Sequence, residues 1–183
     1  MPPARPRDAA VAAQIARVLR DVPDFPRPGI LFKDIAGLVA DPNVFDAVVD
    51  ELAQMLADTA DIDLVAGVEA RGFLFAGALA RQLRCGILPV RKAGKLPPPT
   101  LRRSYVLEYG SADIEIPAGL AAGRRVVLID DVLATGGTLR AAAELLVEAG
   151  ATVAAVGVIV ELDALRGRDE LRGLAPLHSL LRL

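Results

Sequence analysis

The sequence predicts a doubly wound α/β fold built on a parallel sheet with an inserted flexible hairpin, and two observations support this prediction. Segments typical of strands alternate with segments typical of helices along most of the chain. The strand segments are continuously apolar, as expected for a sheet that is covered on both faces. The 183 residues, 53% of them hydrophobic and 24% charged, suffice for one domain with a sizeable core.

The first predicted elements are a helix, a proline-rich stretch and a second helix. Residues 8–20 have apolar side chains at helical spacing. Residues 21–34 contain three prolines, which exclude a helix there. Asp41 followed by Pro42 is typical of a helix start, and the apolar residues between 44 and 56 recur on one helical face.

Strands and helices then alternate, interrupted by a cationic, proline-rich loop and a hairpin. In chain order we expect a strand at 62–68, a helix at 71–84 stopped by Gly86, a strand at 87–90, the loop at 91–100, hairpin strands near 104–109 and 113–116, a strand at 125–130, a helix at 137–149 stopped by Gly150, and a strand at 151–160. The whole chain is therefore expected to form a single domain.

Composition and charge exclude several classes of protein. The formal net charge of −2 leaves no basic field of the kind that nucleic-acid binding requires. Cys85 is the only cysteine and His178 the only histidine, which excludes a disulfide framework and a Cys/His zinc site and argues against a catalytic histidine. The longest apolar run, 151–160, is too short to cross a bilayer, and residues 1–10 do not resemble a signal peptide. The sequence predicts a cytoplasmic protein that binds neither nucleic acid nor membrane.

The strongest indication of a ligand site lies at 126–138, where an apolar strand is followed by two carboxylates and a glycine-rich turn. Ligands of open α/β sheets bind at the carboxyl ends of strands. Backbone N–H groups of such a turn can hold a phosphate, whereas Asp130 and Asp131 suit sugar hydroxyls. The turn, called the glycine turn below, consists of Ala134, Thr135, Gly136, Gly137 and Thr138. These residues predict a ribose 5-phosphate site; the alternative is an ordinary strand–turn–helix with a solvated acidic pair.

The stretch at 126–138 resembles the phosphoribosyl-pyrophosphate signature of the type I phosphoribosyltransferases. Three further stretches resemble the members of this family that act on adenine: DFPRPGILFKDI (24–35), EARGFLF (69–75), and RKAGKLP with YVLEYG (91–97 and 105–110). They occur in the same order and cover nearly the whole chain. Ala93 departs from the proline or basic residue that family members often carry, and Lys33 stands where some have arginine.

The resemblance implies that adenine and phosphoribosyl pyrophosphate react to give AMP and diphosphate. It implies Mg²⁺ carried by the diphosphate, with no direct protein ligand to the metal, and a homodimer with shared sites. It also implies that residues 1–36 form an N-terminal helix and a base-binding hood, and residues 37–183 a core with a flexible loop at 91–117. Two alternatives stay open: the same chemistry on hypoxanthine, guanine or xanthine, and a regulator that binds phosphoribosyl pyrophosphate without catalysis.

Positive charge for the leaving diphosphate is expected in two places. By the resemblance, Glu69 and Ala70 with Arg71 form a pyrophosphate loop, in which Gly72 permits close backbone approach. A second cationic cluster follows the next strand, at Arg91, Lys92 and Lys95, and the resemblance implies that it reaches the site of the neighbouring subunit. The alternative for both is a solvated surface charge.

Adenine recognition and proton transfer are assigned by the resemblance as well. Phe32 would stack on the base, the backbone of Leu31 would read the exocyclic amine, and Lys33 would approach a ring nitrogen; the alternative is that this apolar stretch is simply core. Glu108 is the candidate for catalytic proton transfer, with Tyr109 packing over the substrates as part of a lid. The alternative for Glu108 is an exposed strand residue.

Overall fold

The computed structural model describes residues 6–59, 61–107 and 110–183. The strands are β1 (Arg20–Pro23), β2 (Leu31–Asp34), β3 (Leu64–Val68), β4 (Gly86–Lys92), β5 (Thr100–Leu107), β6 (Gly110–Pro117), β7 (Arg125–Leu133), β8 (Thr152–Glu161) and β9 (Leu177–Arg182). The helices are α1 (Pro6–Val18), α2 (Ala36–Ala40), α3 (Pro42–Met55), α4 (Gly72–Leu83), α5 (Gly137–Glu148) and α6 (Gly167–Glu170), with a 3-10 turn at Asp163–Leu165.

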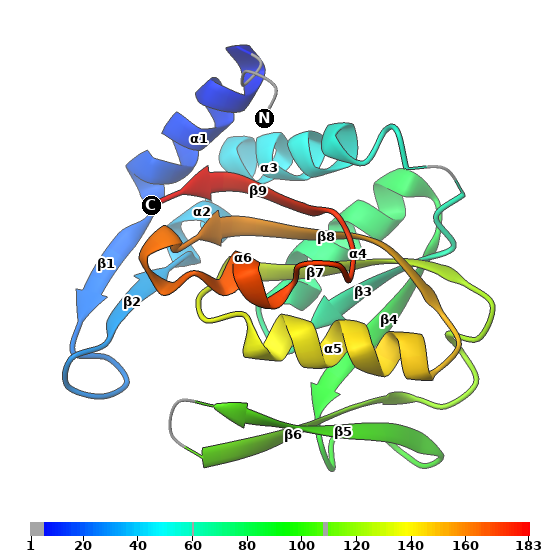
Figure 1. The fold of residues 1–183 in the computed structure, drawn as a ribbon. Coiled ribbons are helices and arrows are strands. Elements are labelled where there is room, and N and C mark those ends of the chain that lie inside the picture. Colours follow the sequence, from blue (N-terminus) through cyan, green and yellow to red (C-terminus); the bar gives the residue numbers. More distant parts are fainter. Residues whose placement is uncertain (1–5, 60, 108–109) are drawn as a thin grey trace.

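A seven-stranded sheet in the order β5-β6-β4-β3-β7-β8-β9 forms the centre of the molecule (Figure 1). Strands β4, β3, β7, β8 and β9 run parallel, and the β5–β6 hairpin joins the edge of β4 antiparallel. β1 and β2 form a separate antiparallel pair. The predicted α/β fold with an inserted hairpin is confirmed, with a sheet that is mostly rather than wholly parallel.

Helices cover both faces of this sheet. Val126 and Leu128 of β7 belong to the core beneath α5, whereas Val127 and Ile129 belong to the core beneath α1, α3 and α4. Successive side chains of a strand point to opposite faces, so a strand covered on both sides must be apolar at each of these positions. This is why the strand segments lack polar alternation.

The local signals at the helix ends act as the sequence indicates, with one exception. The Asp41 side chain accepts hydrogen bonds from the backbone of Asn43 and Val44, which caps α3. Gly150 follows α5 with a φ of +84°, as expected of a glycine stop. α4, however, ends at Arg84, which is itself left-handed with a φ of +57°. Gly86 instead starts β4, where a Cβ would lie 2.7 Å from Leu64.

Several predicted boundaries are wrong. β7 continues to Leu133 because Val132 and Leu133 still pair with β8, so the two aspartates lie inside the strand and not at its end. The expected loop at 91–100 is shorter, because β4 runs through Lys92 and β5 begins at Thr100. The first helix ends at Val18, and the following residues form β1. Elements β1, β2, α2, α6 and β9 were not anticipated, since their segments are short or mixed in polarity.

The carboxyl ends of the parallel strands, the β1–β2 hairpin and the first turn of α5 lie on the same side of the molecule (Figure 1). The sequence motifs therefore meet at one end of the sheet, as ligand sites of open α/β sheets do. Within the described residues, no helix is long and apolar enough to span a membrane.

Candidate functional site

Arg71 is the residue at which three distant stretches of the sequence meet. It lies between β3 and α4, and its Nε is 2.7 Å from Oδ2 of Asp131 on β7. Its Nη1 donates to the carbonyl of Lys33 at 3.1 Å, and its guanidinium lies 4.7 Å from the centre of the Phe32 ring. The expected diphosphate, ribose and base residues are thus brought together around one cation.

The two aspartates of β7 occupy different environments. Asp131 is almost fully buried, and apart from its ion pair with Arg71 its Oδ2 has no hydrogen-bond partner. Asp130 is partly buried, and its Oδ1 accepts a hydrogen bond from the backbone of Asp131 at 2.9 Å. Burial, and then the neighbouring Asp131 charge, raise the pKa of Asp130 well above its usual value. Burial also raises the pKa of Asp131, although Arg71 opposes the shift. The pair is not the solvated surface feature of the alternative interpretation.

Close backbone packing places this acidic pair against the start of α4. A Cβ on Gly72 would lie 2.8 Å from the carbonyl of Ile129 and 3.1 Å from Oδ1 of Asp130. The absence of a side chain at Gly72 is therefore required by β7. The sequence indicated close approach at this glycine, but to a ligand rather than to a neighbouring strand.

The glycine turn connects β7 to α5. Gly136 caps the helix with a φ of +88°, a conformation that glycine adopts without strain. Ala134, Gly137 and Thr138 are partly buried and Thr135 is exposed, so the turn faces solvent on one side. α5 is 12 residues long, and the unpaired N–H groups of its first turn favour an anion. The turn therefore leads into a helix start that can accept an anion such as a phosphate.

The second cationic cluster is tied to Glu69. Nε of Arg91 lies 3.2 Å from Oε2 of Glu69, and the backbone of Lys92 donates to the same oxygen at 3.0 Å. Burial would raise the pKa of Glu69, but Arg91 and the Lys92 backbone hold it below its usual value. The Arg91 guanidinium also donates to the carbonyl of Lys95, so these residues of the cluster are held in one arrangement.

Glu115 on β6 holds the turn that carries Lys95. Its side chain is fully buried and accepts from the backbone of Lys95 and Leu96, both at 2.8 Å, and from Nε of Arg102 at 2.9 Å. Burial would raise the pKa of Glu115, but backbone donors from Gly94 to Leu96, together with Arg102, lower it to about 2. Glu115 is therefore charged at neutral pH and fixes this loop.

The expected base-binding stretch is not simple core. Leu31 is half-exposed, Phe32 is partly buried, and Phe25 contacts the Phe32 ring edge-on at a centroid distance of 5.1 Å. The ammonium of Lys33 lies 2.7 Å from Asp21 on the neighbouring strand β1. Phe25, Phe32 and Arg71 thus form a partly exposed cluster of two aromatic rings and one cation.

Tyr105 links the β5–β6 hairpin to the glycine turn. The Thr138 hydroxyl and the Tyr105 hydroxyl are 3.2 Å apart, within hydrogen-bond distance. Arg103 of the same strand forms ion pairs with Glu144 and Glu148 of α5. The hairpin is thus docked along α5. Glu108 and Tyr109 lie outside the described residues.

Three residues of this end of the molecule were missed by sequence reasoning: Asp21, Tyr105 and Glu115. Asp21 and Tyr105 stand inside the recognised stretches or beside them, but nothing in their spacing shows what they contact. Glu115 gives a possible signal, because an acidic residue between the isoleucines 114 and 116 of a strand is unusual in a buried position. The role of Glu115 becomes visible only in the structure, where β6 of the hairpin brings its carboxylate to the backbone of Lys95 and Leu96.

No group of three or more His, Cys, Asp or Glu side chains that could hold a metal occurs in the part of the chain that the structure describes. His178 lies on β9, where burial, and then the charge of Arg168, lower its pKa. None of the contacts around Arg71 involves it.

Comparison with known proteins gives the family to which this geometry corresponds. Residues 38–175 match the phosphoribosyl transferase domain family. The adenine phosphoribosyltransferase of Kineococcus radiotolerans is 54% identical over 172 residues, which cover 92% of each chain. The crystal structure of adenine phosphoribosyltransferase from Thermoanaerobacter pseudethanolicus superposes with a TM-score of 0.90 at 43% identity, covering 94% of this chain and 99% of that one.

A third relative was crystallised with ligands. Adenine phosphoribosyltransferase from Saccharomyces cerevisiae, complexed with D-2,5-dideoxy-2,5-imino-altritol 1,6-bisphosphate and adenine, is 38% identical. It superposes with a TM-score of 0.86, covering 94% of this chain and 99% of the yeast chain.

Proposed function

Because this chain belongs to the phosphoribosyltransferase family and has the adenine phosphoribosyltransferase activity of purine salvage, we propose that the residues gathered around Arg71 form its active site. In the reaction, N9 of adenine forms a bond to C1 of phosphoribosyl pyrophosphate while the bond from C1 to the diphosphate oxygen breaks. The base gives up a proton, and AMP and diphosphate leave. The convergence of Phe32, Arg71 and Asp131 is the observation that carries the proposal.

The leaving diphosphate is stabilised by Arg71, Arg91, Lys92 and Lys95, with Glu69 and Ala70 forming the loop that presents Arg71. Arg71 and Arg91 each have a carboxylate partner in the structure, Asp131 and Glu69. When the donor binds, each arginine therefore exchanges a protein carboxylate for the more highly charged diphosphate. The attraction between arginine and diphosphate strengthens as negative charge develops on the leaving group. An ammonium is a compact point charge, so Lys92 and Lys95, both exposed, can follow the moving oxygens.

Asp130 and Asp131 hold the ribose hydroxyls, and the glycine turn holds the 5-phosphate. The spacing along β7 and the turn separates the acids from the phosphate, which avoids repulsion between like charges. Once Arg71 turns to the diphosphate, the buried Oδ2 of Asp131 requires a new partner, and a sugar hydroxyl supplies one. Backbone N–H groups at the start of α5 serve the phosphate.

Mg²⁺ enters with the donor. Carboxylate oxygens such as those of Asp130 are the hard ligands that Mg²⁺ prefers, and this ion commonly retains water when it binds through phosphates. Asp130 and Asp131 of β7 would therefore fit an ion that is held mainly by the diphosphate and reached through water or ribose hydroxyls. The ion neutralises charge on the leaving diphosphate.

Adenine stacks on Phe32, whose ring is also contacted by Arg71. The backbone at Leu31 reads the exocyclic amine, and Lys33 approaches a ring nitrogen when it leaves Asp21. Glu108 takes the proton of the base, because no histidine lies among these residues, and Tyr109 packs over the substrates. Residues 1–36 act as the helix and base-binding hood of a single domain spanning 1–183.

A homodimer with shared sites completes the proposal. Leu74 of α4 and Ile87 of β4 are large apolar side chains, each about half exposed at 47% and 49%. They lie on adjoining elements, since a Cβ on Gly77 would meet Ile87 at 3.9 Å, and apolar surface of this kind marks an interface. β4 leads directly from Ile87 to the cationic cluster, which supports a position of that cluster near the partner. A cytoplasmic location accompanies this proposal, because the single thiol of Cys85 can form no disulfide within the chain.

Mixed dimers test the sharing of sites. Arg91 pairs with Glu69 of its own chain, so the cationic variant is Lys92→Ala with Lys95→Ala, which leaves that pair intact. A chain carrying these changes is combined with a chain carrying Asp130→Asn and Asp131→Asn. We expect the heterodimer to regain one competent site, with each parent homodimer impaired. A verified heterodimer without regained activity contradicts shared sites, and a monomer in sedimentation contradicts the dimer.

A panel of bases with phosphoribosyl pyrophosphate and Mg²⁺ tests the reaction itself. We expect nucleotide formation with adenine at a kcat/KM far above that with hypoxanthine, guanine or xanthine. Arg71→Met, which keeps an apolar contact with Phe32 but removes the charge, should raise the donor KM. Formation of IMP or GMP without AMP would contradict the assigned base. The non-catalytic alternative is not supported, because the relatives that match nearly the whole chain are enzymes of this type.

A further inference from the structure

The glycine turn has a wall behind it, formed by residues 163–170, which we call the α6 segment. A Cβ on Gly136 would lie 2.5 Å from the carbonyl of Gly167 and 3.1 Å from Cβ of Glu170. In the opposite direction, a Cβ on Gly167 would clash with the carbonyl of Ala134 and lie 2.9 Å from Leu133. Two glycines thus pack back to back, and the turn takes its shape against the α6 segment.

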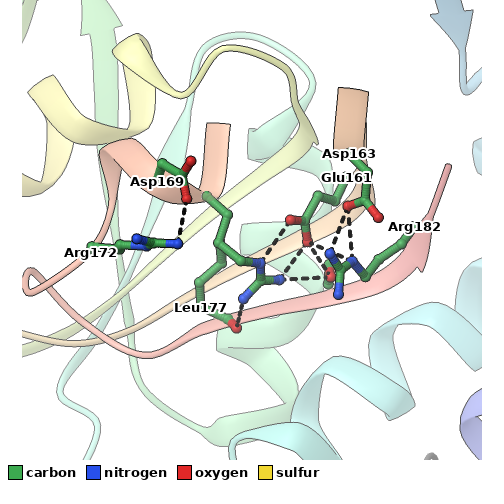
Figure 2. Close-up of polar contacts among 8 residues, drawn as sticks. Glu161, Asp163, Asp169, Arg172, Leu177 and Arg182 are labelled. Atoms are coloured by element: carbon green, nitrogen blue, oxygen red, sulfur yellow. Dashed lines mark hydrogen bonds and ion pairs between the residues drawn. The ribbon is translucent and has the colours of Figure 1, made fainter. Parts of the chain in front are cut away.

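Arg168 makes the most extensive contacts between the α6 segment and the sheet, and Arg182 of β9 also pairs with Asp163 of the segment. Nε of Arg168 donates to Oε1 of Glu161 at 2.7 Å, its Nη1 donates to the carbonyl of Leu177 at 3.0 Å, and its Nη2 reaches Oγ of Ser179 at 3.2 Å. Glu161 ends β8 and is 2% exposed, and the other two residues belong to the β9 edge. Figure 2 shows the Glu161 carboxylate in the middle of this network and the Leu177 carbonyl at its lower end.

Electrostatics keep this anchor in place at neutral pH. Burial would raise the pKa of Glu161, but hydrogen bonds from Arg168 and Ser179 hold it below its usual value. The same contacts raise the pKa of Arg168, so both partners are charged. Two nitrogens of the Arg168 guanidinium contact the two oxygens of the buried Glu161 carboxylate. This two-point contact fixes the orientation of both side chains, which a single hydrogen bond from a lysine would not do.

The outer part of the network has a different character. A hollow of about 430 Å³ is lined by charged residues of the α6 segment and its neighbours, and each of these charges is paired with another lining residue. Arg172, for example, is 77% exposed and pairs with Asp169, as Figure 2 shows. Arg166 and Arg172 share the carboxylate of Asp169, so the charges of the hollow are bound up in contacts among its own lining residues, and this network serves the fold.

We propose that Arg168 is a positioning residue for the donor 5-phosphate: it anchors the α6 segment, and the segment sets the backbone of the glycine turn through the contact between Gly167 and Gly136. Arg168 touches no substrate. The affinity for a phosphate held by backbone N–H groups depends on where those groups point. A shift of the α6 segment therefore moves the phosphate site without altering the base site. The inference rests on the proposed location of the 5-phosphate.

The test compares Arg168→Ala, Arg168→Lys and the matched control Arg172→Ala, with donor and adenine KM measured separately and folding followed by thermal unfolding. We expect Arg168→Ala to raise the donor KM at least tenfold and to leave the adenine KM within twofold. Arg168→Lys should be intermediate, because it restores the charge but not the fork. Arg172→Ala should match the wild type. If Arg168→Ala does not fold, the donor KM of Arg168→Lys decides, with a rise of at least threefold expected.

Two outcomes overturn the inference: a donor KM within twofold of wild type in a folded Arg168 variant, or an equal rise in both KM values. A purely structural role would lower kcat by reducing the active fraction and leave the KM values unchanged. Thr135→Asp, which places a carboxylate in the exposed part of the turn, tests the premise independently. If Thr135→Asp also leaves the donor KM unchanged, the proposed phosphate location fails; if only the Arg168 variants do so, only the positioning role fails.

Discussion

Asp130→Asn should make the protein more stable while weakening its binding of phosphoribosyl pyrophosphate. The wild-type carboxylate is partly buried beside Asp131, and its pKa is raised well above the usual value by burial and by that neighbour. An acid whose folded pKa exceeds its unfolded pKa costs stability at a pH above both values, about 1.4 kcal/mol for each unit of difference. Asparagine removes the charge and keeps the Oδ1 that accepts from the Asp131 backbone.

The sign of the pH dependence distinguishes this cause from others. The cost in the wild type is absent below the unfolded pKa, near 3.8, and fully present above the raised folded pKa. The free energy of unfolding of the wild type should therefore approach that of Asp130→Asn as pH falls through this window. In donor binding, losing a charged hydrogen bond costs about 1.5–3 kcal/mol, or about 10- to 150-fold in affinity.

Urea unfolding between pH 4 and 8 and calorimetry with the Mg²⁺ salt of phosphoribosyl pyrophosphate measure the two effects. Asp50→Asn is the control, because its carboxylate is exposed on α3, where it accepts a hydrogen bond from the Gln82 side chain at 3.0 Å, far from β7 in the sequence. A variant no more stable than wild type at pH 7, or a stability difference that does not change with pH, refutes the buried-charge argument. Unchanged donor affinity refutes the ribose assignment.

Three further predictions concern proton transfer, the cationic loop and close packing. Glu108→Gln should lower kcat by roughly 10²–10⁴ with little change in donor affinity, and steady-state turnover within a few-fold of wild type would assign the proton to water or backbone. Glu115→Gln should make the free energy of unfolding depend less on pH in acid. A folded pKa of about 2 against an ordinary 4.5 stabilises the wild type at a pH above 4.5, and this stabilisation is lost as the pH falls toward 2. Equal midpoints of acid unfolding for the two proteins would contradict this prediction. Gly72→Ala should destabilise the fold, although alanine favours helices over glycine by about 1 kcal/mol. Gly77→Ala on the same helix, where a Cβ would meet only Ile87 at 3.9 Å, should stabilise it. If thermal unfolding shows stability changes of the same sign for both variants, the steric argument fails.

Most of the strands and helices of the sheet, and the conformation of the glycine turn, could be predicted from the sequence for physical reasons. β7 is apolar at successive positions because both of its faces are covered, and Asp41 with Pro42 starts α3 through purely local hydrogen bonds. The glycine turn likewise depends on a local requirement, a positive φ at Gly136. Such signals need only neighbouring residues, so the linear sequence contains them.

Pairing between distant residues was decided by the tertiary structure alone. β7 runs past its two aspartates because β8 continues to pair with it, and no property of the residues 130–133 themselves indicates this. Arg71 meets Asp131 because β3 and β7 are neighbours in the sheet, and it also meets Phe32 of the separate β1–β2 pair. Glu115 meets the backbone of the 94–96 loop because the hairpin pairs with β4. A sequence specifies the charges and apolar faces that can be buried. The partner of each buried charge depends on which elements become neighbours when the chain folds.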